Sequence, residues 1–183
     1  MSREKTVIAI AAMPGAGKGT AAELASDLGI PVIVCGDVVR EEASRRRMPP
    51  TPENLGSLML SMRDEEGPDV VAKRLIPRIA GTESGIVVVE GLRSLDELKL
   101  LRKHFKVRLL AIHSSPDQRL QRLLRRGRSD DPRNYEEFQQ RDMRELAVGI
   151  GSVIALADHL IVNDSTIETF KSKLDRFYEE VVR

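Results

Sequence analysis

The fold is decided by the apolar run Val7-Ile8-Ala9-Ile10-Ala11 and the loop after it, Ala12-Met13-Pro14-Gly15-Ala16-Gly17-Lys18-Gly19-Thr20. A helical pattern of apolar residues begins directly after this loop. A strand, a glycine-rich loop ending in Gly-Lys and a helix, in this order, form the context that a P-loop requires. Its glycines let backbone N–H groups curl around phosphates, and Lys18 reaches the β and γ phosphates. The segment therefore predicts a nucleoside triphosphate site, rather than a turn beside a solvated lysine.

Two positions depart from the usual P-loop pattern. Ala12 stands where the first glycine belongs, which restricts the backbone of the loop. Gly19 stands where a magnesium-binding hydroxyl usually follows the lysine, so the hydroxyl comes one place later, at Thr20. We therefore expect Mg²⁺ to be held through water by Thr20 and Glu90, rather than by a direct hydroxyl bond.

Five apolar runs of strand length recur along the chain, and helical patterns separate them. The runs are mostly continuous rather than alternating, as expected for a parallel sheet that is covered on both faces. This order predicts an α/β fold of the P-loop NTPase type, with a five-stranded parallel sheet flanked by helices. We expect one kinase domain over residues 1–183, with an acceptor-binding insertion at about 38–80 and a lid at about 122–145. The expected strands are 7–11, 32–35, 86–90, 107–112 and 159–162.

Start and stop signals mark most of the expected helices. Gly29 closes the first helix, Thr51 and Pro52 start another that Gly67 stops, and Pro77 should kink the helix that follows. Three later helices begin with the pattern of a capping box, namely Ser94 with Glu97, Ser115 with Gln118, and Ser165 with Glu168. The last helix has a core-facing stripe of Ile167, Phe170, Leu174, Phe177 and Val181.

The composition narrows the class of protein. A formal net charge of +1 gives no sign of a nucleic-acid or membrane partner, and no run approaches the length of a membrane span. Cys35 is the only cysteine, and the apolar N-terminal run is interrupted too soon for a signal peptide, so we expect a cytoplasmic protein. The three histidines, His104, His113 and His159, lack ligand spacing, and we expect no zinc. The oligomeric state cannot be read from the sequence.

Four motifs resemble those of nucleoside monophosphate kinases. The Pro-Gly-x-Gly-Lys-Gly-Thr form of the loop resembles the P-loop of adenylate kinases. Gly36-Asp37-Val38-Val39-Arg40 is similar to their Gly-Asp-Met-Leu-Arg motif, whose arginine holds the phosphate of the acceptor. Glu90-Gly91-Leu92-Arg93 resembles their Asp-Gly-Phe-Pro-Arg, shortened by one residue. Residues 125–131 are similar to the arginine-rich lid of short-lid UMP/CMP kinases. Across almost its whole length the chain resembles an archaeal family of adenylate-kinase-like proteins, sometimes labelled dephospho-CoA-kinase-related.

The resemblance implies a role for each of these residues in phosphoryl transfer. Lys18 and the loop amides would hold ATP, and Glu90 would act as a Walker B carboxylate on Mg²⁺ or its waters. Asp37 would assist the metal or orient the attacking oxygen. Arg40 and Arg93 would bind a phosphorylated acceptor, because guanidinium groups match phosphate bidentately. The expected catalytic residues are Lys18, Asp37, Arg93, Arg128 and Arg141.

The basic run 119–128 and the arginines at 141 and 144 are interpreted as a lid. Arg128 and Arg141 are its expected contacts and Arg119 its expected bystander, while Tyr135 and Phe138 are expected to pack beneath the lid helix. An RNA-binding interpretation is weaker, because the region contains no RNA motif.

Three functions remain open at this point. The first is an ATP- and Mg²⁺-dependent kinase acting on a nucleoside monophosphate or a related phosphorylated small molecule. The second keeps the ATP site and makes dephospho-CoA the acceptor. The third is a regulatory switch that binds ATP or AMP and has no small-molecule acceptor. The glutamine that reads adenine in adenylate kinases has no counterpart at 94–98, which leaves Asp96 or Glu97 as candidates for reading a base.

Overall fold

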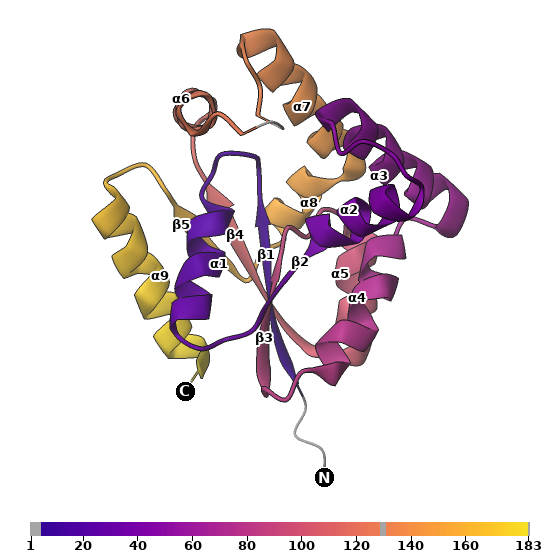
Figure 1. Cartoon of the computed structure of the whole chain (residues 1–183). Helices are drawn as coiled ribbons and strands as arrows, with labels where there is room; N and C mark the ends of the chain where they lie inside the picture. Colours follow the sequence, from indigo (N-terminus) through magenta and orange to yellow (C-terminus); the bar gives the residue numbers. More distant parts are fainter. Residues whose placement is uncertain (1–4, 129–130, 183) are drawn as a thin grey trace.

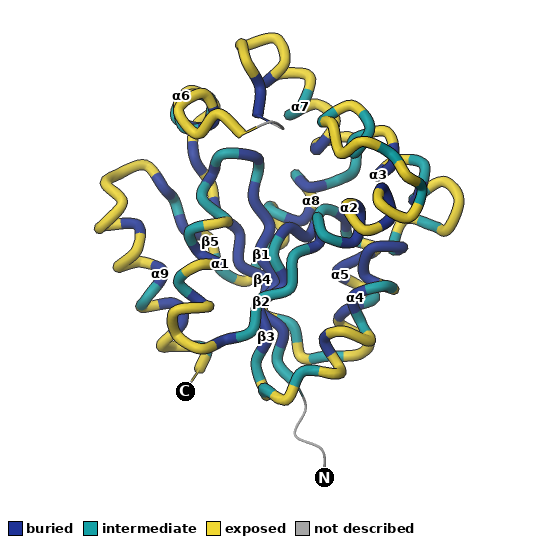
Figure 2. Tube along the Cα trace, viewed as in Figure 1, coloured by how far each residue is buried: buried dark blue, intermediate teal, exposed yellow. Residues whose placement is uncertain are grey.

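The computed structural model describes residues 5–128 and 131–182 and contains one parallel sheet of five strands in the order β2-β3-β1-β4-β5 (Figure 1). In β1, Val7 to Ala11 are completely buried, because helices cover the sheet on both faces (Figure 2). The expected α/β fold is thus confirmed. β1 and β4 are one residue longer at each end than expected, and Cys35 begins a helix instead of ending the second strand. The strands are β1 Thr6–Ala12, β2 Val32–Val34, β3 Ile86–Glu90, β4 Lys106–His113 and β5 His159–Val162.

The helices form two layers around the sheet and a cap above the carboxyl ends of its strands (Figure 1). Ile8 and Ile10 of β1 pack in one core with α1 and α9, whereas Val7 and Ala9 face a second core built with α2 to α5 and α8. Helices α6 and α7 follow β4 and lie near the P-loop end of the sheet. The helices are α1 Lys18–Asp27, α2 Cys35–Arg45, α3 Pro52–Glu66, α4 Val70–Gly81, α5 Leu95–His104, α6 Pro116–Arg126, α7 Tyr135–Val148, α8 Ile150–Ala155 and α9 Ile167–Val182.

The helix starts largely follow the sequence signals. Ser94 and Glu97 form the complete capping box, and Thr51 caps α3 as expected. Ser115 caps α6, but the side chain of Gln118 binds Ser114 and Asp164 instead of completing the box. The prediction of a cap at Ser165 was wrong: the hydroxyl of Thr166 accepts the N–H of Thr169 at 3.3 Å, because α9 begins one residue later.

Of two further helix expectations, the stripe of α9 was modified and the kink at Pro77 stays a prediction. Helix α4 continues through Pro77 to Gly81. In α9, Ile167 at the first position is 49% exposed, whereas Tyr178 is completely buried and its hydroxyl donates to the carbonyl of Ala21 at 2.7 Å. The described part of the chain has no helix with the length and apolar character to cross a membrane.

Helices α2 and α4 are joined by a buried carboxylate. Glu42 of α2 is 2% exposed and accepts hydrogen bonds from Arg45, from Arg46 at 2.6 Å and from Arg74 of α4 at 2.9 Å. Hydrogen bonds from Arg45, then from Arg46 and Arg74, hold the pKa of Glu42 below its ordinary value of 4.5. A carboxyl with a depressed pKa stabilises the fold above its unfolded-state pKa and loses that contribution as the pH falls.

We therefore expect Glu42→Gln to lower the melting temperature at pH 7 by about 5 °C, because three guanidinium groups lose their shared anion. The difference from the wild type should shrink as the pH falls below 4.5, because the carboxyl of the unfolded chain then takes up a proton whereas the folded carboxyl, with its lower pKa, is still ionised. Calorimetry between pH 3 and pH 7 measures both effects. Glu41→Gln is the control, because Glu41 is exposed and its side chain pairs with Arg78 at the surface. An equal loss in both variants would contradict the role of Glu42.

Candidate active site

The P-loop joins β1 to α1 in a conformation that requires its glycines. Gly15 has a φ of 81° and Gly17 a φ of 115°, and Gly17 immediately precedes the first residue of α1, Lys18. A Cβ on Gly17 would lie 2.7 Å from the Nδ2 atom of Asn163 and 2.9 Å from the ring of Phe170. The N–H groups of the first helical turn have no intrahelical acceptor and are available to an anion. Ala12 is the last residue of β1 and is 3% exposed, so its methyl group serves the core.

The carbonyl side of the loop is held from behind by three side chains. The carbonyl oxygens of 14, 15 and 16 accept hydrogen bonds, in that order, from Arg119 at 3.1 Å, Arg122 at 3.4 Å and the amide of Asn163 at 2.9 Å. Arg122 also donates to the carbonyl and side-chain oxygens of Asn163, at 3.0 and 3.3 Å. The peptide groups are thereby oriented with their carbonyls away from the phosphate site.

This arrangement corrects the interpretation of the basic run. Arg119 is not a bystander: it is 4% exposed, its two terminal nitrogens bind Asp142 of α7 at 2.9 and 2.5 Å, and it lies 4.9 Å from the ring centre of Phe138. Phe138 is buried as expected, but Tyr135 is 56% exposed and does not pack beneath the helix.

Lys18 lies beside the carboxylate that ends β3. Its Nζ is 3.8 Å from Oε1 of Glu90, and the two side chains are 26% and 13% exposed. Burial lowers the pKa of Lys18, while the negative charge of Glu90 opposes this shift. Glu90 pairs in register with Ile10 of the adjacent β1, which places it at the carboxyl edge beside the loop. Thr20 lies in the first turn of α1. These oxygen donors fit a hydrated Mg²⁺ ion, which binds through one or two carboxylates and keeps several waters.

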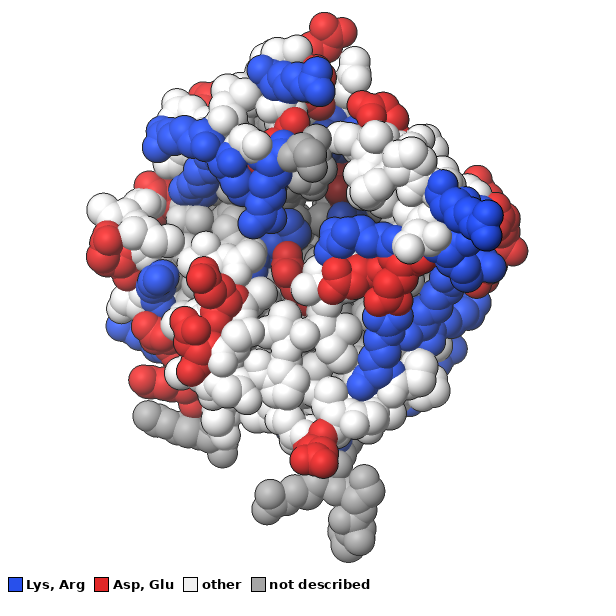
Figure 3. Space-filling model, viewed as in Figure 1, with Lys and Arg blue, Asp and Glu red and all other residues white. Residues whose placement is uncertain are grey.

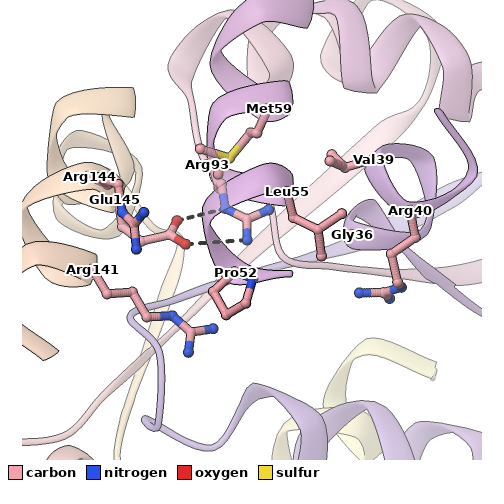
Figure 4. A pocket seen from close by; sticks show the side chains of 11 residues that line it. Gly36, Val39, Arg40, Pro52, Leu55, Met59, Arg93, Arg141, Arg144 and Glu145 are labelled. Carbon is pink, nitrogen blue, oxygen red and sulfur yellow. Dashed lines mark hydrogen bonds and ion pairs between the residues drawn. The ribbon is translucent and has the colours of Figure 1, made fainter. Parts of the chain in front are cut away.

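A cleft with an empty volume of about 700 Å³, part of it open solvent, lies among α2, α3, α7 and the end of β3 (Figure 4). Its charged walls bring together arginines from three separate parts of the chain, and its remaining wall is apolar or glycine. Figure 3 shows Lys and Arg side chains gathered around the hollow on this side of the molecule. The lining residues are Gly36, Val39, Arg40, Pro52, Leu55, Gly56, Met59, Arg93, Arg141, Arg144 and Glu145.

Arg93 is held in the cleft by Glu145 (Figure 4). The Nε and Nη2 atoms of Arg93 donate to the carboxylate of Glu145 at 2.6 and 3.4 Å. The charge of Glu145 raises the pKa of Arg93. Burial by itself would raise the pKa of Glu145, but Arg93, Lys18 and Arg141 together hold it below its usual range. Sequence reasoning missed Glu145, although its place four residues after Arg141 on one helix face is a signal that could have found it.

The other expected site residues occupy different places. Arg40 lines the cleft and binds Asp37, with Nη2 2.5 Å from Oδ1, so Asp37 lies on α2 as the partner of Arg40. Arg141 lines the cleft and its Nη1 is 3.5 Å from Oδ1 of Asp131. Arg128 is exposed, and its backbone N–H donates to Asp131 at 3.0 Å. The roles of Asp37 and Arg128 in catalysis stay predictions, and lid positions 129 and 130 lie outside the described residues.

The carboxylate of Glu97 is already used. It accepts the N–H groups of Arg93 and Ser94 at the start of α5, and it pairs with Arg63 at 2.5 Å. Asp96 is exposed and lies 3.9 Å from Lys99. Neither residue lines the cleft, so neither is placed to read a base there.

The sheet order, the loop and the lysine define a P-loop nucleotide-binding protein with a kinase-like fold. A family model described as an AAA domain matches residues 11–139. Solved structures similar to this chain are a shikimate kinase from Bacteroides thetaiotaomicron, at a TM-score of 0.61, 16% identity and coverage of 98% and 99% of the two chains, and a shikimate kinase from Acinetobacter baumannii in complex with shikimate, at a TM-score of 0.59, 15% identity and coverage of 98% and 93%. At such low identity these likenesses show the fold alone.

The chain belongs to the UPF0200 family. It is 48% identical to the UPF0200 protein of Hyperthermus butylicus over 172 residues, which cover 94% of this chain and 92% of that protein. It is 46% identical to the Pyrococcus horikoshii relative, with coverage of 96% and 97%. The expected archaeal family with a kinase-like P-loop domain is therefore confirmed at this level.

We expect Arg122→Ala to weaken nucleotide binding about tenfold. The loop carbonyl at 15 and the side-chain oxygen of Asn163 lose their hydrogen-bond donor in this variant. The nucleotide must then supply the free energy that orders the loop. Arg125→Ala is the matched control on the same helix, since Arg125 is exposed and bonds only to Gln121 in the described contacts. Titration calorimetry with ADP measures both variants. Equal affinities in the two variants would contradict a holding role for Arg122.

Proposed function

We propose that this protein is an ATP-dependent, Mg²⁺-requiring phosphotransferase acting on a nucleoside monophosphate or a related phosphorylated small molecule. The observation that carries the proposal is the joining of two sites. The arginine-lined cleft adjoins the P-loop at the end of β3: Glu90, the last residue of that strand, lies 3.8 Å from Lys18, and Arg93, three residues further along the chain, lines the cleft. A protein that only bound a triphosphate would have no need of a second cationic cleft at this position.

Phosphoryl transfer needs donor and acceptor in line and positive groups where charge spreads. Lys18 and the N–H groups of the loop would bind the β and γ phosphates, and Arg93 and Arg141 would bind the acceptor and the phosphoryl group in transfer. Mg²⁺, held through water by Glu90 and Thr20, supplies charge neutralisation between the phosphates when bound. Asp37 would orient the attacking oxygen once an acceptor has drawn Arg40 away from it.

The cleft wall also bears on which acceptor fits. Among the described lining residues there is no amide or hydroxyl side chain, and the uncharged wall is formed by Gly36, Val39, Pro52, Leu55, Gly56 and Met59. Such a wall gives apolar contact and little base discrimination. We therefore propose that the protein recognises the acceptor through its anionic groups. We also propose that the partners are small molecules in the cytoplasm rather than nucleic acids or membranes.

The proposal is tested by offering ATP and Mg²⁺ with a panel of nucleoside monophosphates and dephospho-CoA, and by identifying phosphorylated product. We expect acceptor-dependent release of ADP, and a loss of at least a hundredfold in rate for Lys18→Ala. Phosphorylation of dephospho-CoA alone would move the assignment to the second enzyme. Binding of ATP with slow hydrolysis and no phosphorylated acceptor would instead support a nucleotide-dependent switch.

Arg93→Ala should weaken acceptor binding by at least tenfold and leave ATP binding within about twofold, because its guanidinium lines the cleft and not the loop. Arg93→Lys keeps the charge beside Glu145 while removing the bidentate fork, and it guards against misfolding of the alanine variant. Arg102→Ala, an exposed change on α5, is the control. Equal loss of ATP and acceptor binding, measured by calorimetry, would remove Arg93 from this role.

A further inference from the structure

A glycine occupies the interior of α3 without a conformational reason. Gly56 is the fifth residue of Pro52–Glu66, and its φ is not among the positive values found for other glycines in the described chain. Glycine is one of the least favourable residues in a helix interior, and alanine is the most favourable. Glycine at position 56 therefore makes α3 less stable than alanine would, and we look for a contact that requires the absence of a side chain there.

The contact is with Arg144 of α7. A Cβ on Gly56 would lie 3.1 Å from Nη1 and 3.7 Å from Cζ of Arg144, which is closer than nine in ten real contacts of a Cβ in the first case. The guanidinium group therefore lies against the bare backbone of α3, across the cleft from its own helix. Both residues line the cleft, so this approach fixes where the guanidinium group of Arg144 enters it.

Arg144 also differs from the other cleft arginines in its partners. Each of the other three already contacts a carboxylate: Arg40 with Asp37, Arg93 with Glu145, and Arg141 with Asp131. Arg144 is exposed, and among the described residues no carboxylate forms an ion pair with it. Within the described part of the cleft, its charge is therefore the one that is free to pair with an anionic ligand.

We propose that Arg144, admitted by Gly56, is a specificity-determining residue that binds a second anionic group of the acceptor, distinct from the phosphate bound by Arg93 and Arg141. This inference rests on the proposed function and narrows its substrate class. It favours phosphorylated molecules with two separate anionic groups, such as two phosphates or a phosphate and a carboxylate, over simple nucleoside monophosphates, which carry one. The apolar residues Val39, Leu55 and Met59 would contact the body that joins these groups.

Substitution of Gly56 by alanine should have opposite effects on the stability of the helix and on anion binding. Alanine should stabilise α3 through helix propensity, and its methyl group should push the flexible end of Arg144 aside. Gly56→Ala should therefore keep or raise the melting temperature while weakening anion binding, a pair of effects that a purely structural glycine would not give. Gly81→Ala is the matched control, because Gly81 is helical, has open space around its Cβ position and lies outside the cleft.

The measurement is a titration of each ADP-saturated variant with inorganic phosphate, followed by phosphorus NMR at constant ionic strength. Besides any phosphate ion at the γ position beside ADP, we expect the wild type and Gly81→Ala to bind two phosphate ions in the cleft, and Gly56→Ala and Arg144→Gln to lose one of these two by at least tenfold in affinity. A single phosphate in the cleft of the wild type, or two with unchanged affinity on Gly56→Ala, would overturn the inference. Normal ADP binding with only the second phosphate missing refutes this inference alone, whereas absent ADP binding refutes the proposed function as well.

Discussion

The site depends on three hydrogen bonds made to the back of the P-loop. Arg119, Arg122 and Asn163 bind three successive carbonyl oxygens of the loop, at 14, 15 and 16. A peptide group whose carbonyl is fixed on one side presents its N–H on the other, so the bonds to carbonyls 14 and 16 orient the N–H groups of Gly15 and Gly17 before any nucleotide arrives. The N–H of Ala16 instead donates to the carbonyl of Met13 at 3.1 Å and closes the turn of the loop. Gly17 is part of the same constraint, because any side chain there would collide with Asn163.

The same side chains connect the donor loop to the acceptor cleft. Arg119 joins the loop carbonyl of Pro14 to Asp142 of α7, and three residues further along that helix Glu145 holds Arg93. Residues three apart lie on neighbouring parts of one helical face. Helix α7 is thus fixed at one point to the P-loop and at the next to the cleft, which explains why arginines from distant segments converge beside Lys18.

The sequence predicted best where a residue's chemistry is local. The strands, the P-loop and the caps at Thr51 and Ser94 depend on neighbours in sequence. Arg93 could be placed in the same way, because it lies three residues after the end of β3. The basic run was misread at Arg119 because its partners, Pro14 and Asp142, lie 105 and 23 residues away. Glu145 and Gly56 escaped notice for a related reason. Glu145 of α7 meets Arg93 only once α7 lies beside the segment after β3, and Gly56 meets Arg144 only once α3 faces α7.

The pairing of the cleft arginines has an energetic consequence for recognition. A guanidinium that already shares a carboxylate gains less from a new anion than an unpaired one, since the anion must compete with the existing partner. Arg40, Arg93 and Arg141 therefore hold their geometry in the free protein at the expense of some affinity. Selectivity then falls to the cation without such a partner among the described residues, Arg144, and to the glycine that gives it room. Under the proposed function, the arginines with carboxylate partners would orient an acceptor, and Arg144 would decide which acceptors remain bound.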